Sequence, residues 1–504
     1  MRAVAAATVV AFLAMTGSAA ATNGRPFTIP ALRQWKGGSG TFTLPKAPRI
    51  VAPGRLTGVA RTLAAELHGA TSHRKGEIRL ALVTSGPAGE GYTLSIGRHG
   101  IRIAARTPTG VFWGTRTLLQ LLHTGRHVPI GRARDWPRYP DRGLMIDNGR
   151  KYFTPKWIAR EIKRLSYLKL NRLHMHFSDN QGFRIESKRH PEVVSAFHLR
   201  QREVRSLVAL GKRYHVKLVP EIDMPGHMQA ALEKHPELQL ADASGQRAAD
   251  KLDYTKPEAR KFAGELIEEY VGLFPAKQWH MGADEFLGVL FPPTAADYAR
   301  YPQLEAYAKA KYGPTANAKD GFLGFVNDID ALVRAHGKTL RVWNDGLDGG
   351  NAVKLNPDIV VEWWNNPAGP GSGPGPQDFV AQGHEVLNAG WFPTYYVSGS
   401  SETSTPPRPD MSWAYEDWDV NRFLGLYYAN RQTHEPEFVV PPAEPLNRGS
   451  ELHVWNDDPT AESEAEIAAG IAPRLRVIAQ KTWNSPLFVP DYAGFERLAT
   501  RVGG

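Results

Sequence analysis

Two adjacent carboxylates, Asp284 and Glu285, are the residues in this sequence best suited to chemistry. They end the stretch QWHMGADE, whose first residues have the pattern of an apolar strand, and His280 precedes Asp284 by four positions. Neighbouring side chains of a strand point to opposite faces. At the end of a strand, where the chain turns into a loop, both side chains can enter one pocket. We therefore expect both acids to serve one site.

The adjacency of these acids restricts the possible reaction. Glycoside hydrolysis usually needs two carboxyl groups on opposite sides of the anomeric carbon, about 5 to 9 Å apart. Adjacent residues fit that arrangement poorly. They fit better if one acid protonates the leaving oxygen while the other orients a nucleophilic group of the substrate. The carbonyl oxygen of a 2-acetamido sugar is such a group, because it can attack the anomeric carbon and form a cyclic oxazolinium.

Eight short apolar runs follow residue 142, and helical stretches separate most of them. They span residues 143–148, 172–177, 217–222, 278–284, 339–345, 358–364, 384–390 and 450–457. This alternation predicts an α/β fold, a parallel (β/α)₈ TIM barrel. Two stretches depart from it, a Gly/Pro loop over 365–383 and an irregular region over 391–449. Long loops in such a barrel usually build or cover the site.

Residues 25–135 follow a different pattern. Residues 77–83 and 91–105 alternate apolar and polar side chains, the second with a turn at its centre, and residues 109–122 have the spacing of an amphipathic helix. We expect a small α+β domain with an antiparallel sheet. A Pro-rich, charged linker then leads to the catalytic barrel, which we place at 138–495. In the barrel, Thr154 before Pro155 predicts the start of one helix.

The first residues predict a secreted protein. Arg2 precedes an apolar run over 3–15, and the sequence SAAAT then offers a cleavage site, so residues 1–21 are interpreted as a signal peptide. The run is shorter than the ~20 residues that span a bilayer, so we expect no membrane insertion. The chain contains no Cys, which excludes disulfides. Its net charge of +10 is spread out rather than gathered in basic runs, so we expect no nucleic-acid partner.

Acids and indoles gather where the barrel strands are predicted to end, and a TIM barrel carries its site at that end. The residues there are Asp147, Asp179, Asp223, His227, Asp284, Glu285, Trp343, Asp345, Trp363, Trp364, Asn388, Trp391, Trp455 and Asp457. Indoles stack on the apolar face of a sugar, and carboxylates accept hydrogen bonds from its hydroxyls. A glycan with an N-acetylhexosamine unit is therefore the expected partner.

The stretch HMGADE resembles the H-x-G-x-D-E signature of glycoside hydrolase family 20, the β-N-acetylhexosaminidases. Further similar stretches are residues 90–122, 141–155, 169–186, 218–230 and 452–457. The resemblance covers nearly all of the chain after the signal peptide. It implies a retaining exo-glycosidase that releases terminal β-linked N-acetylhexosamine through an oxazolinium intermediate and needs no cofactor or metal.

Carried over by motif, the resemblance implies a role for each candidate residue. Glu285 would be the general acid and later the general base, and Asp284 would orient the acetamido group. Asp179 and His227 would form a relay behind Glu285, with His280 outside the direct contacts. The remaining candidates would bind the sugar: Arg142 its 3- and 4-hydroxyls, Trp343, Trp364 and Trp455 its ring and acetamido methyl, Tyr396 (or its neighbour Tyr395) the acetamido carbonyl, and Asp457 its outer hydroxyls.

Two positions depart from the family pattern. Ser398 stands where the family often has an Asp of a Tyr-x-Asp motif, and Asp457 stands where it usually has Glu. The shorter acid resembles the lacto-N-biosidases of the same family, which remove a galactosyl-N-acetylglucosamine disaccharide. Arg142 favours the exo-hexosaminidase, because hydrogen bonds to the 3-hydroxyl suit an unsubstituted terminal sugar.

Two other classes of function remain open. In a metal-dependent barrel hydrolase, His174 and His176 would lie on one strand face, and His227, His280 and Asp284 could add ligands. Loss of activity after exhaustive chelation would favour that class. A catalytically inactive sugar-binding protein is the second alternative, and the intact pair of acids argues against it.

Overall fold

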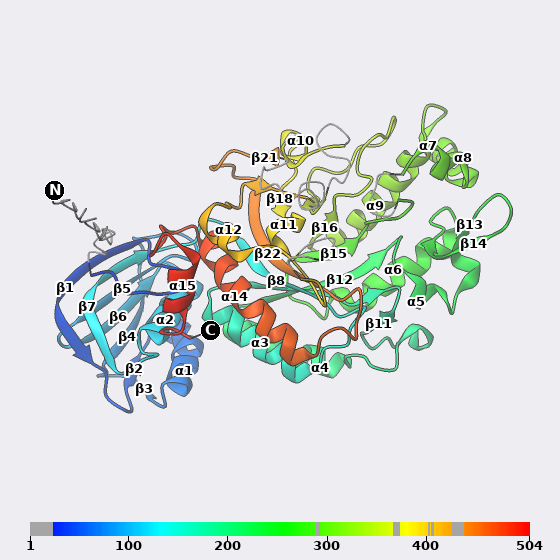
Figure 1. Ribbon diagram of the computed structural model, residues 1–504. Coiled ribbons are helices and arrows are strands. Elements are labelled where there is room, and N and C mark those ends of the chain that lie inside the picture. Colours follow the sequence, from blue (N-terminus) through cyan, green and yellow to red (C-terminus); the bar gives the residue numbers. More distant parts are fainter. Residues whose placement is uncertain are drawn as a thin grey trace, which may run out of the picture.

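The computed structural model describes residues 24–288, 293–365, 373–401, 404, 408–425 and 438–503. A sheet domain at the N-terminus is followed by a barrel (Figure 1). The predicted signal peptide lies outside the described residues, and so do parts of the two predicted loops at 365–383 and 391–449. None of the helices among the described residues has the length and apolar character needed to cross a membrane.

Eight parallel strands form a closed barrel, which confirms the predicted fold. In chain order they are β8 (Asp141–Asp147), β9 (Arg172–His176), β12 (Lys217–Met224), β15 (Gln278–Gly282), β16 (Thr339–Trp343), β17 (Val360–Trp363), β18 (Val386–Asn388) and β22 (Asn447–Trp455). Each pairs with the next, and β22 pairs with both β18 and β8, which closes the ring. A short strand, β19 (Tyr395–Val397), adds to β22.

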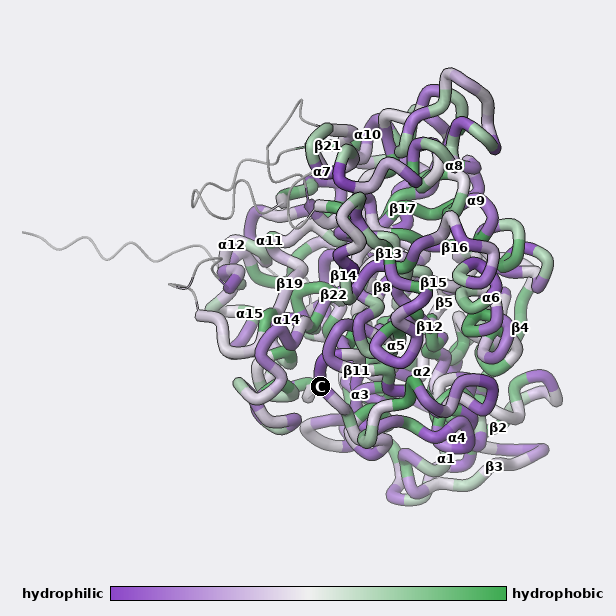
Figure 2. Tube along the Cα trace, turned by 90° about the vertical axis from the view of Figure 1, so that its right-hand side faces the viewer, coloured by the Kyte–Doolittle hydropathy of each residue, from purple (hydrophilic) through white to green (hydrophobic). Residues whose placement is uncertain are grey.

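Helices surround the barrel, and hydrophobic stretches run through its strands while hydrophilic ones lie along the outer helices (Figure 2). The main helices are α3 (Pro155–Tyr167), α4 (Gln201–Tyr214), α6 (Pro257–Val271), α8 (Pro302–Tyr312), α9 (Ala318–Ala335) and α14 (Glu464–Trp483). The predicted start of α3 is confirmed, because the Thr154 hydroxyl accepts a hydrogen bond from the Trp157 amide at 3.2 Å. The stretch predicted as a loop contains a short helix, α10 (Pro376–Ala381). The Asp378 carboxylate accepts a hydrogen bond from the Gly375 amide and so caps the start of this helix.

Shorter elements connect these parts. They are η2 (Pro191–Val193), α5 (Gln229–Leu232), η3 (Pro236–Leu238), α7 (Ala295–Ala299), α11 (Trp391–Thr394), α12 (Met411–Glu416), α15 (Tyr492–Ala499), β10 (Ser178–Asp179), β11 (Gly182–Phe183), β13 (Gln239–Ala241), β14 (Arg247–Leu252), β20 (Arg422–Phe423) and β21 (Phe438–Val439).

The N-terminal domain is a seven-stranded sheet in the order β1-β7-β5-β6-β4-β2-β3. Its elements are β1 (Gln34–Thr43), β2 (Arg49–Val51), η1 (Gly54–Leu56), α1 (Thr57–Glu66), β3 (Ala70–Ser72), β4 (Ile78–Leu82), β5 (Tyr92–Gly97), β6 (Gly100–Ala105), α2 (Pro108–Leu121) and β7 (His127–Asp135). The predicted hairpin is β5–β6, and β1, β7, β5 and β6 pair antiparallel as expected. The pairs β6–β4, β4–β2 and β2–β3 are parallel, so the sheet is mixed.

Buried polar contacts join the two domains. Lys169 donates to Asp135 at 3.0 Å, and both side chains are fully buried. Gln120 of α2 donates to the Tyr167 carbonyl at 3.0 Å. These contacts fix the sheet domain against the amino-terminal end of the barrel, opposite the strand ends where the candidate acids lie.

Candidate active site

Asp284 and Glu285 follow the end of β15 by two and three residues, and the backbone turns sharply there. Gly282, Ala283 and Glu285 have φ values of 76°, 77° and 45°, all in the left-handed region. This turn brings both carboxylates to one imidazole: Nε2 of His227 lies 3.2 Å from Oε2 of Glu285 and 3.6 Å from Oδ2 of Asp284. The two acids that a regular strand would separate thus face the same group.

Steric crowding explains why the HMGADE motif has a glycine, Gly282. A Cβ at Gly282 would lie 1.7 Å from Oδ1 of Asp223, and the positive φ also favours glycine. A Cβ at Gly226 would lie 2.7 Å from the Asp284 carbonyl oxygen. The loops after β12 and β15 therefore touch backbone to backbone, and this contact sets the position of both acids.

A chain of polar contacts runs from Glu285 into the barrel. His227 Nδ1 lies 3.2 Å from Asp179 Oδ1, and Asp179 Oδ2 lies 2.9 Å from His176 Nε2. The other nitrogen of His176 lies 2.8 Å from Glu221 Oε2. The structure thus brings together the four residues predicted as catalytic, and His176 and Glu221 continue this chain of polar contacts.

The charges around His227 favour its protonated form. Burial lowers the pKa of His227, but the carboxylates of Asp284 and Asp179 outweigh it and hold the pKa well above its usual range. Burial likewise opposes ionisation of Asp179, yet Arg150 and His227 hold the pKa of that carboxyl well below its ordinary value. An imidazolium at His227 can stabilise a carboxylate that forms at Glu285.

Asp284 belongs to a group of buried acids. Burial and neighbouring carboxylates raise the pKa of Asp284, Asp223 and Asp345. Among the residues that the structure describes, Oδ1 of Asp284 is buried and has no hydrogen-bond partner. Leaving a buried acceptor unpaired costs about 1 to 3 kcal/mol. A substrate N–H donor at this oxygen would remove that cost.

Aromatic rings gather beside the acids. The rings of Trp343 and Trp455 lie 5.9 Å apart, and Tyr395 lies 6.0 Å from Trp455. Tyr395 also stacks on Trp364 at 6.3 Å with an interplanar angle of 6°. Trp364 donates its indole N–H to Asp345 at 2.5 Å, and Trp343 donates its own to Glu221 at 2.9 Å. The three predicted indoles thus lie together, and buried carboxylates hold two of them, Trp343 and Trp364.

The prediction that Tyr396 lines the site is wrong, and its neighbour Tyr395 lies there instead. Successive side chains of β19 alternate between faces. Tyr396 points away from the barrel, donates to Glu462 at 2.6 Å and lies under the guanidinium of Arg408. The face of Tyr395 is shared by Val397, so Val397 rather than Ser398 stands two residues after the site tyrosine. Ser398 donates to the Asn456 side chain at 2.8 Å.

Arg142 does not reach the sugar site, contrary to the prediction. It is the second residue of β8, at the opposite end of the barrel, and is fully buried. Its guanidinium pairs with Glu90 at 2.5 Å and donates to the Tyr139 carbonyl at 2.7 Å. Arg142 therefore joins the two domains.

Arg150 is the arginine of the site. It lies 2.9 Å from Asp179 and 3.1 Å from Asp147, and its guanidinium lies over the ring of Trp455 at 5.2 Å. It also lies 3.9 Å from Asp457, whose side chain is 62% exposed. The sequence offered a signal for Arg150, because it follows the carboxyl end of β8 by three residues, whereas Arg142 precedes that strand's apolar run.

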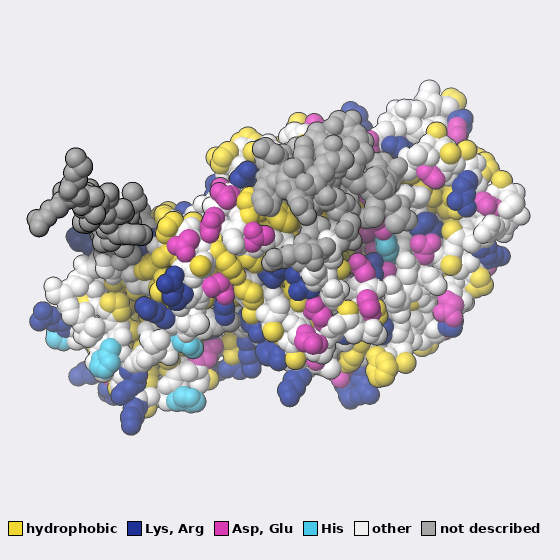
Figure 3. Space-filling view, in the orientation of Figure 1, with side chains coloured by type: hydrophobic (Ala, Val, Ile, Leu, Met, Phe, Trp, Pro, Cys, Tyr) yellow, Lys and Arg dark blue, Asp and Glu magenta, His cyan; other side chains and the backbone are white. Residues whose placement is uncertain are grey.

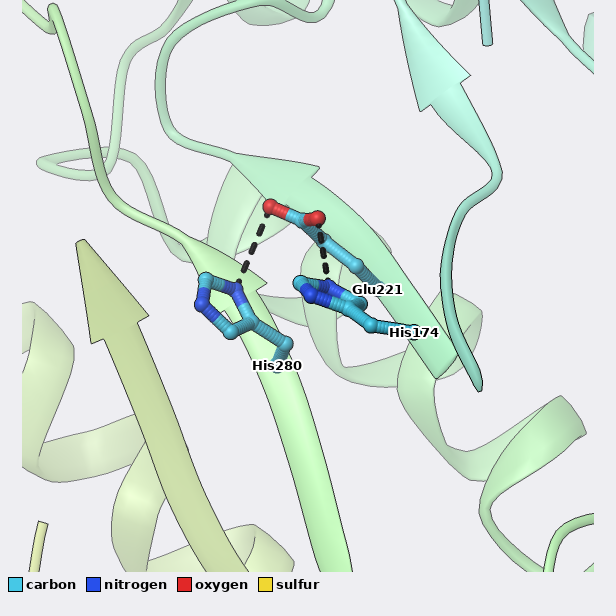
Figure 4. A group of neighbouring side chains, drawn as sticks. All are labelled: His174, Glu221 and His280. Carbon is cyan, nitrogen blue, oxygen red and sulfur yellow. Dashed lines mark ion pairs between the residues drawn. The ribbon is translucent and has the colours of Figure 1, made fainter. Parts of the chain in front are cut away.

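Below the acids, the carboxylate of Glu221 lies close to several imidazoles. Nε2 of His174 and Nδ1 of His280 lie 2.8 and 3.2 Å from its two oxygens (Figure 4). The ligand-type atoms of these three residues lie within 4.8 Å of one another, as a metal site would require. His280, however, also faces Glu362 at 3.3 Å, and both carboxylates, against the effect of burial, raise its pKa to about 9. Glu221 also accepts from the Trp343 indole and lies 2.8 Å from Nδ1 of His176, so we interpret the group as a support for Trp343 and His176.

Known proteins share this architecture. Residues 139–486 match "Glycosyl hydrolase family 20, catalytic domain", and residues 25–136 match "Glycosyl hydrolase family 20, domain 2". The chain is 33% identical to a lacto-N-biosidase of Bifidobacterium bifidum over 91% of its own length, but it spans only 40% of that protein. It is 27% identical to a β-N-acetylhexosaminidase of Cellulomonas fimi, with 92% of this chain and 88% of that one aligned.

A solved structure agrees with these relatives. A mutant Streptomyces plicatus β-hexosaminidase in complex with its product GlcNAc superposes with a TM-score of 0.73 and 25% identity, over 94% of this chain and 93% of that one. Both the sheet domain and the barrel are therefore shared, and the chain belongs to glycosyl hydrolase family 20.

Proposed function

We propose that this enzyme hydrolyses β-linked N-acetylhexosaminides with retention of configuration, as an exo-glycosidase. The observation that carries the proposal is that Asp284 and Glu285 share one imidazole, while Oδ1 of Asp284 is buried and has no partner among the described residues. An acetamido N–H is the donor that this oxygen suits. The neighbouring Glu285 is then left for the glycosidic oxygen.

The reaction proceeds in two steps. Glu285 gives its proton to the leaving oxygen as the C1–O bond breaks, and the acetamido carbonyl oxygen forms a new bond to C1. Asp284 accepts the acetamido N–H and stabilises the positive oxazolinium. Water then attacks C1, its proton passes to the Glu285 carboxylate, and the acetamido group is released. Two inversions at C1 leave the product in the β configuration.

Proton NMR of the first product from an aryl β-N-acetylglucosaminide tests this scheme. The β-anomer is expected before mutarotation, and a thiazoline mimic of the oxazolinium should inhibit far more strongly than free N-acetylglucosamine. An α-anomer as first product, or a thiazoline that binds no better than the free sugar, would refute substrate assistance.

The role of Glu285 has a separate test. Glu285→Gln is expected to lower kcat by about 10²- to 10⁴-fold on substrates with poor leaving groups, because it removes the proton donor. The loss should be smaller on dinitrophenyl glycosides, which leave without a proton. Glu233→Gln, whose side chain is 68% exposed, is the control and should change neither rate. An equal loss on both substrate types would contradict the acid role.

A second candidate is release of a disaccharide whose reducing-end unit is N-acetylglucosamine. Three observations favour it. Val397 stands where the family pattern has an Asp, and the exposed Asp457 stands where it has the longer Glu, so the outer hydroxyls lack these two partners. Arg142, which argued for an unsubstituted sugar, lies outside the site. The lacto-N-biosidase of Bifidobacterium bifidum is also more similar to this chain than the hexosaminidase of Cellulomonas fimi.

Three aryl glycosides compared side by side decide between the candidates: N-acetylglucosaminide, N-acetylgalactosaminide and lacto-N-bioside. A kcat/KM for the lacto-N-bioside at least tenfold above the others would establish disaccharide release. A higher value for either monosaccharide would establish the exo-hexosaminidase.

We also propose that the enzyme is secreted after removal of residues 1–21, on the strength of the apolar run and the cleavage sequence. N-terminal sequencing of protein from the culture medium tests this. A mature chain that begins near residue 22 is expected, and an intact chain retained in the cell would contradict it.

A further inference from the structure

The positive charge of this chain is concentrated in its N-terminal domain. Residues 24–136 contain 17 Lys and Arg and only four Asp and Glu, whereas the rest of the chain contains 44 and 47. The whole net charge of +10 therefore comes from the sheet domain. In Figure 3 Lys and Arg outnumber Asp and Glu on the visible side of this domain, at the left.

Strand register aligns four of these cations. Lys36 pairs with Arg132, Arg132 with Ser95, Ser95 with Arg102, and Arg102 with Arg79, so one row crosses the five neighbouring strands β1, β7, β5, β6 and β4. Paired side chains share a face. At a strand spacing of about 4.8 Å the row is about 19 Å long.

The fifth cation, Arg134, lies two residues from Arg132 and therefore on the same face. We call Lys36, Arg79, Arg102, Arg132 and Arg134 the basic face. All five are exposed, and none has an ion pair with an acid within the part of the chain that the structure describes. Each side chain therefore extends into solvent with its charge uncompensated.

The basic face is the uncovered side of the sheet. Helix α2 packs on the other side, where Gly114 approaches Ile103 and Tyr92, and both helices of the domain lie toward the barrel in Figure 1. An open hollow of about 520 Å³ lies on the uncovered side. Lys36, Arg102, Arg132 and Arg134 line it, and its lining contains no carboxylate.

We propose that the basic face binds an acidic polysaccharide and holds the enzyme on it. A flat row of like charges across a sheet matches an extended polyanion, which would relieve their repulsion. Between the cations, Gln34, Thr93 and Ser95 offer amide and hydroxyl groups that suit sugar hydroxyls.

The same face fits nucleic acid poorly. Single strands need aromatic platforms for their bases, and duplexes are usually entered by a helix or a β-ribbon. The five residues of the basic face include no aromatic ring. Trp35 borders the hollow, but it pairs with the buried Ala133 and lies over Gly131, so its ring packs toward the core.

Binding of the full-length enzyme to dextran sulfate, polygalacturonate and uncharged dextran tests the proposal. The first two probes distinguish sulfate esters from uronates as the source of charge. Arg102→Gln/Arg132→Gln is expected to weaken binding to a charged glycan about tenfold and to lessen its salt dependence. Arg55→Gln/Arg61→Gln is the matched control, with the same charge change near and on α1, and should lose less than twofold. Hydrolysis of an aryl glycoside should be unchanged in both variants.

Several outcomes would overturn the inference. The first is that the wild-type enzyme binds neither charged glycan at physiological salt. The second is that both double variants lose affinity equally, since a general charge effect would then suffice. The third is that duplex DNA of matched charge binds as tightly as the glycans. These results do not depend on the proposed reaction, so failure of one proposal leaves the other standing.

Discussion

Asp284 and Glu285 face the same imidazole although they are neighbours, because the backbone between β15 and its loop is not that of a strand. Positive φ values at Gly282, Ala283 and Glu285 rotate both side chains toward His227. Such backbone conformations cost about 1 to 3 kcal/mol each for residues other than glycine. The surrounding contacts, above all the close approach of residues 226 and 284, hold them in place.

Tyr395 and Tyr396 form a matched pair for testing the site. Tyr395→Phe is expected to lower kcat by about 10- to 100-fold, because in the proposed mechanism its hydroxyl donates to the acetamido carbonyl that attacks C1. Tyr396→Phe should leave kinetics unchanged and reduce the free energy of unfolding by about 1 kcal/mol, since it loses only the bond to Glu462. Steady-state kinetics and urea unfolding of both variants measure this. Reversed effects would return Tyr396 to the site.

Asp223 should make the free energy of unfolding depend on pH. Both its oxygens are buried and have no partner among the described residues, and burial together with Asp284 holds its pKa well above the usual Asp value. An acid whose pKa rises on folding does not change the free energy of unfolding below its unfolded pKa, which is about 3.9. The free energy of unfolding then falls as pH rises from that value toward the folded pKa. Asp223→Asn should therefore stabilise the protein more at pH 8 than at pH 5, by about 1 kcal/mol or more.

Thermal and urea unfolding at both pH values measure that difference. Asp358→Asn, on a side chain that is 71% exposed, is the control and should change stability equally at pH 5 and pH 8. An equal effect of Asp223→Asn at the two pH values would show that the pKa of Asp223 is not raised.

At the scale of strands and helices, hydrophobic runs predicted the barrel well because each strand is buried on both faces. All eight runs correspond to strands, and strand ends located Asp179, His227, Asp284 and Glu285. Side-chain direction beyond a strand end was not predictable in the same way. Alternation separates Tyr395 from Tyr396, and the position of Arg142 near the start of β8 puts it far from the site. Moving a residue by one position along a strand, or from one end of the strand to the other, therefore removes its side chain from the site.

Gly282, at the end of β15, should be required for the turn that positions both acids. Gly282→Ala should reduce stability by about 2 kcal/mol or more and activity by about 10²-fold, because its Cβ would lie 1.7 Å from Asp223 and displace the loop that carries both acids. Gly264→Ala, within α6, is the control. Its Cβ would meet only Leu332 at 3.7 Å, and alanine in a helix should add about 1 kcal/mol. Full activity of Gly282→Ala would show that the turn does not position the acids.

For the whole molecule, the sheet domain presents two different surfaces. One side packs against the barrel through buried charges, among them Lys169 with Asp135 and Arg142 with Glu90. The other side carries the basic face. The two domains therefore have separate tasks, the barrel holding the chemistry and the sheet domain supporting its amino-terminal end while facing outward.

A substitution at Arg142 tests whether the sheet domain supports the barrel without taking part in the chemistry. Arg142→Gln should lower the free energy of unfolding by about 3 kcal/mol or more, because it leaves Glu90 and the Tyr139 carbonyl without their buried partner. The kcat/KM of the folded fraction should change less than about twofold, since no atom of this side chain faces the acids. Arg138→Gln, at an exposed neighbouring position, should cost less than about 0.5 kcal/mol. If Arg142→Gln raised KM with stability unchanged, the arginine would bind substrate, and the preference for a substituted sugar would lose one of its supports.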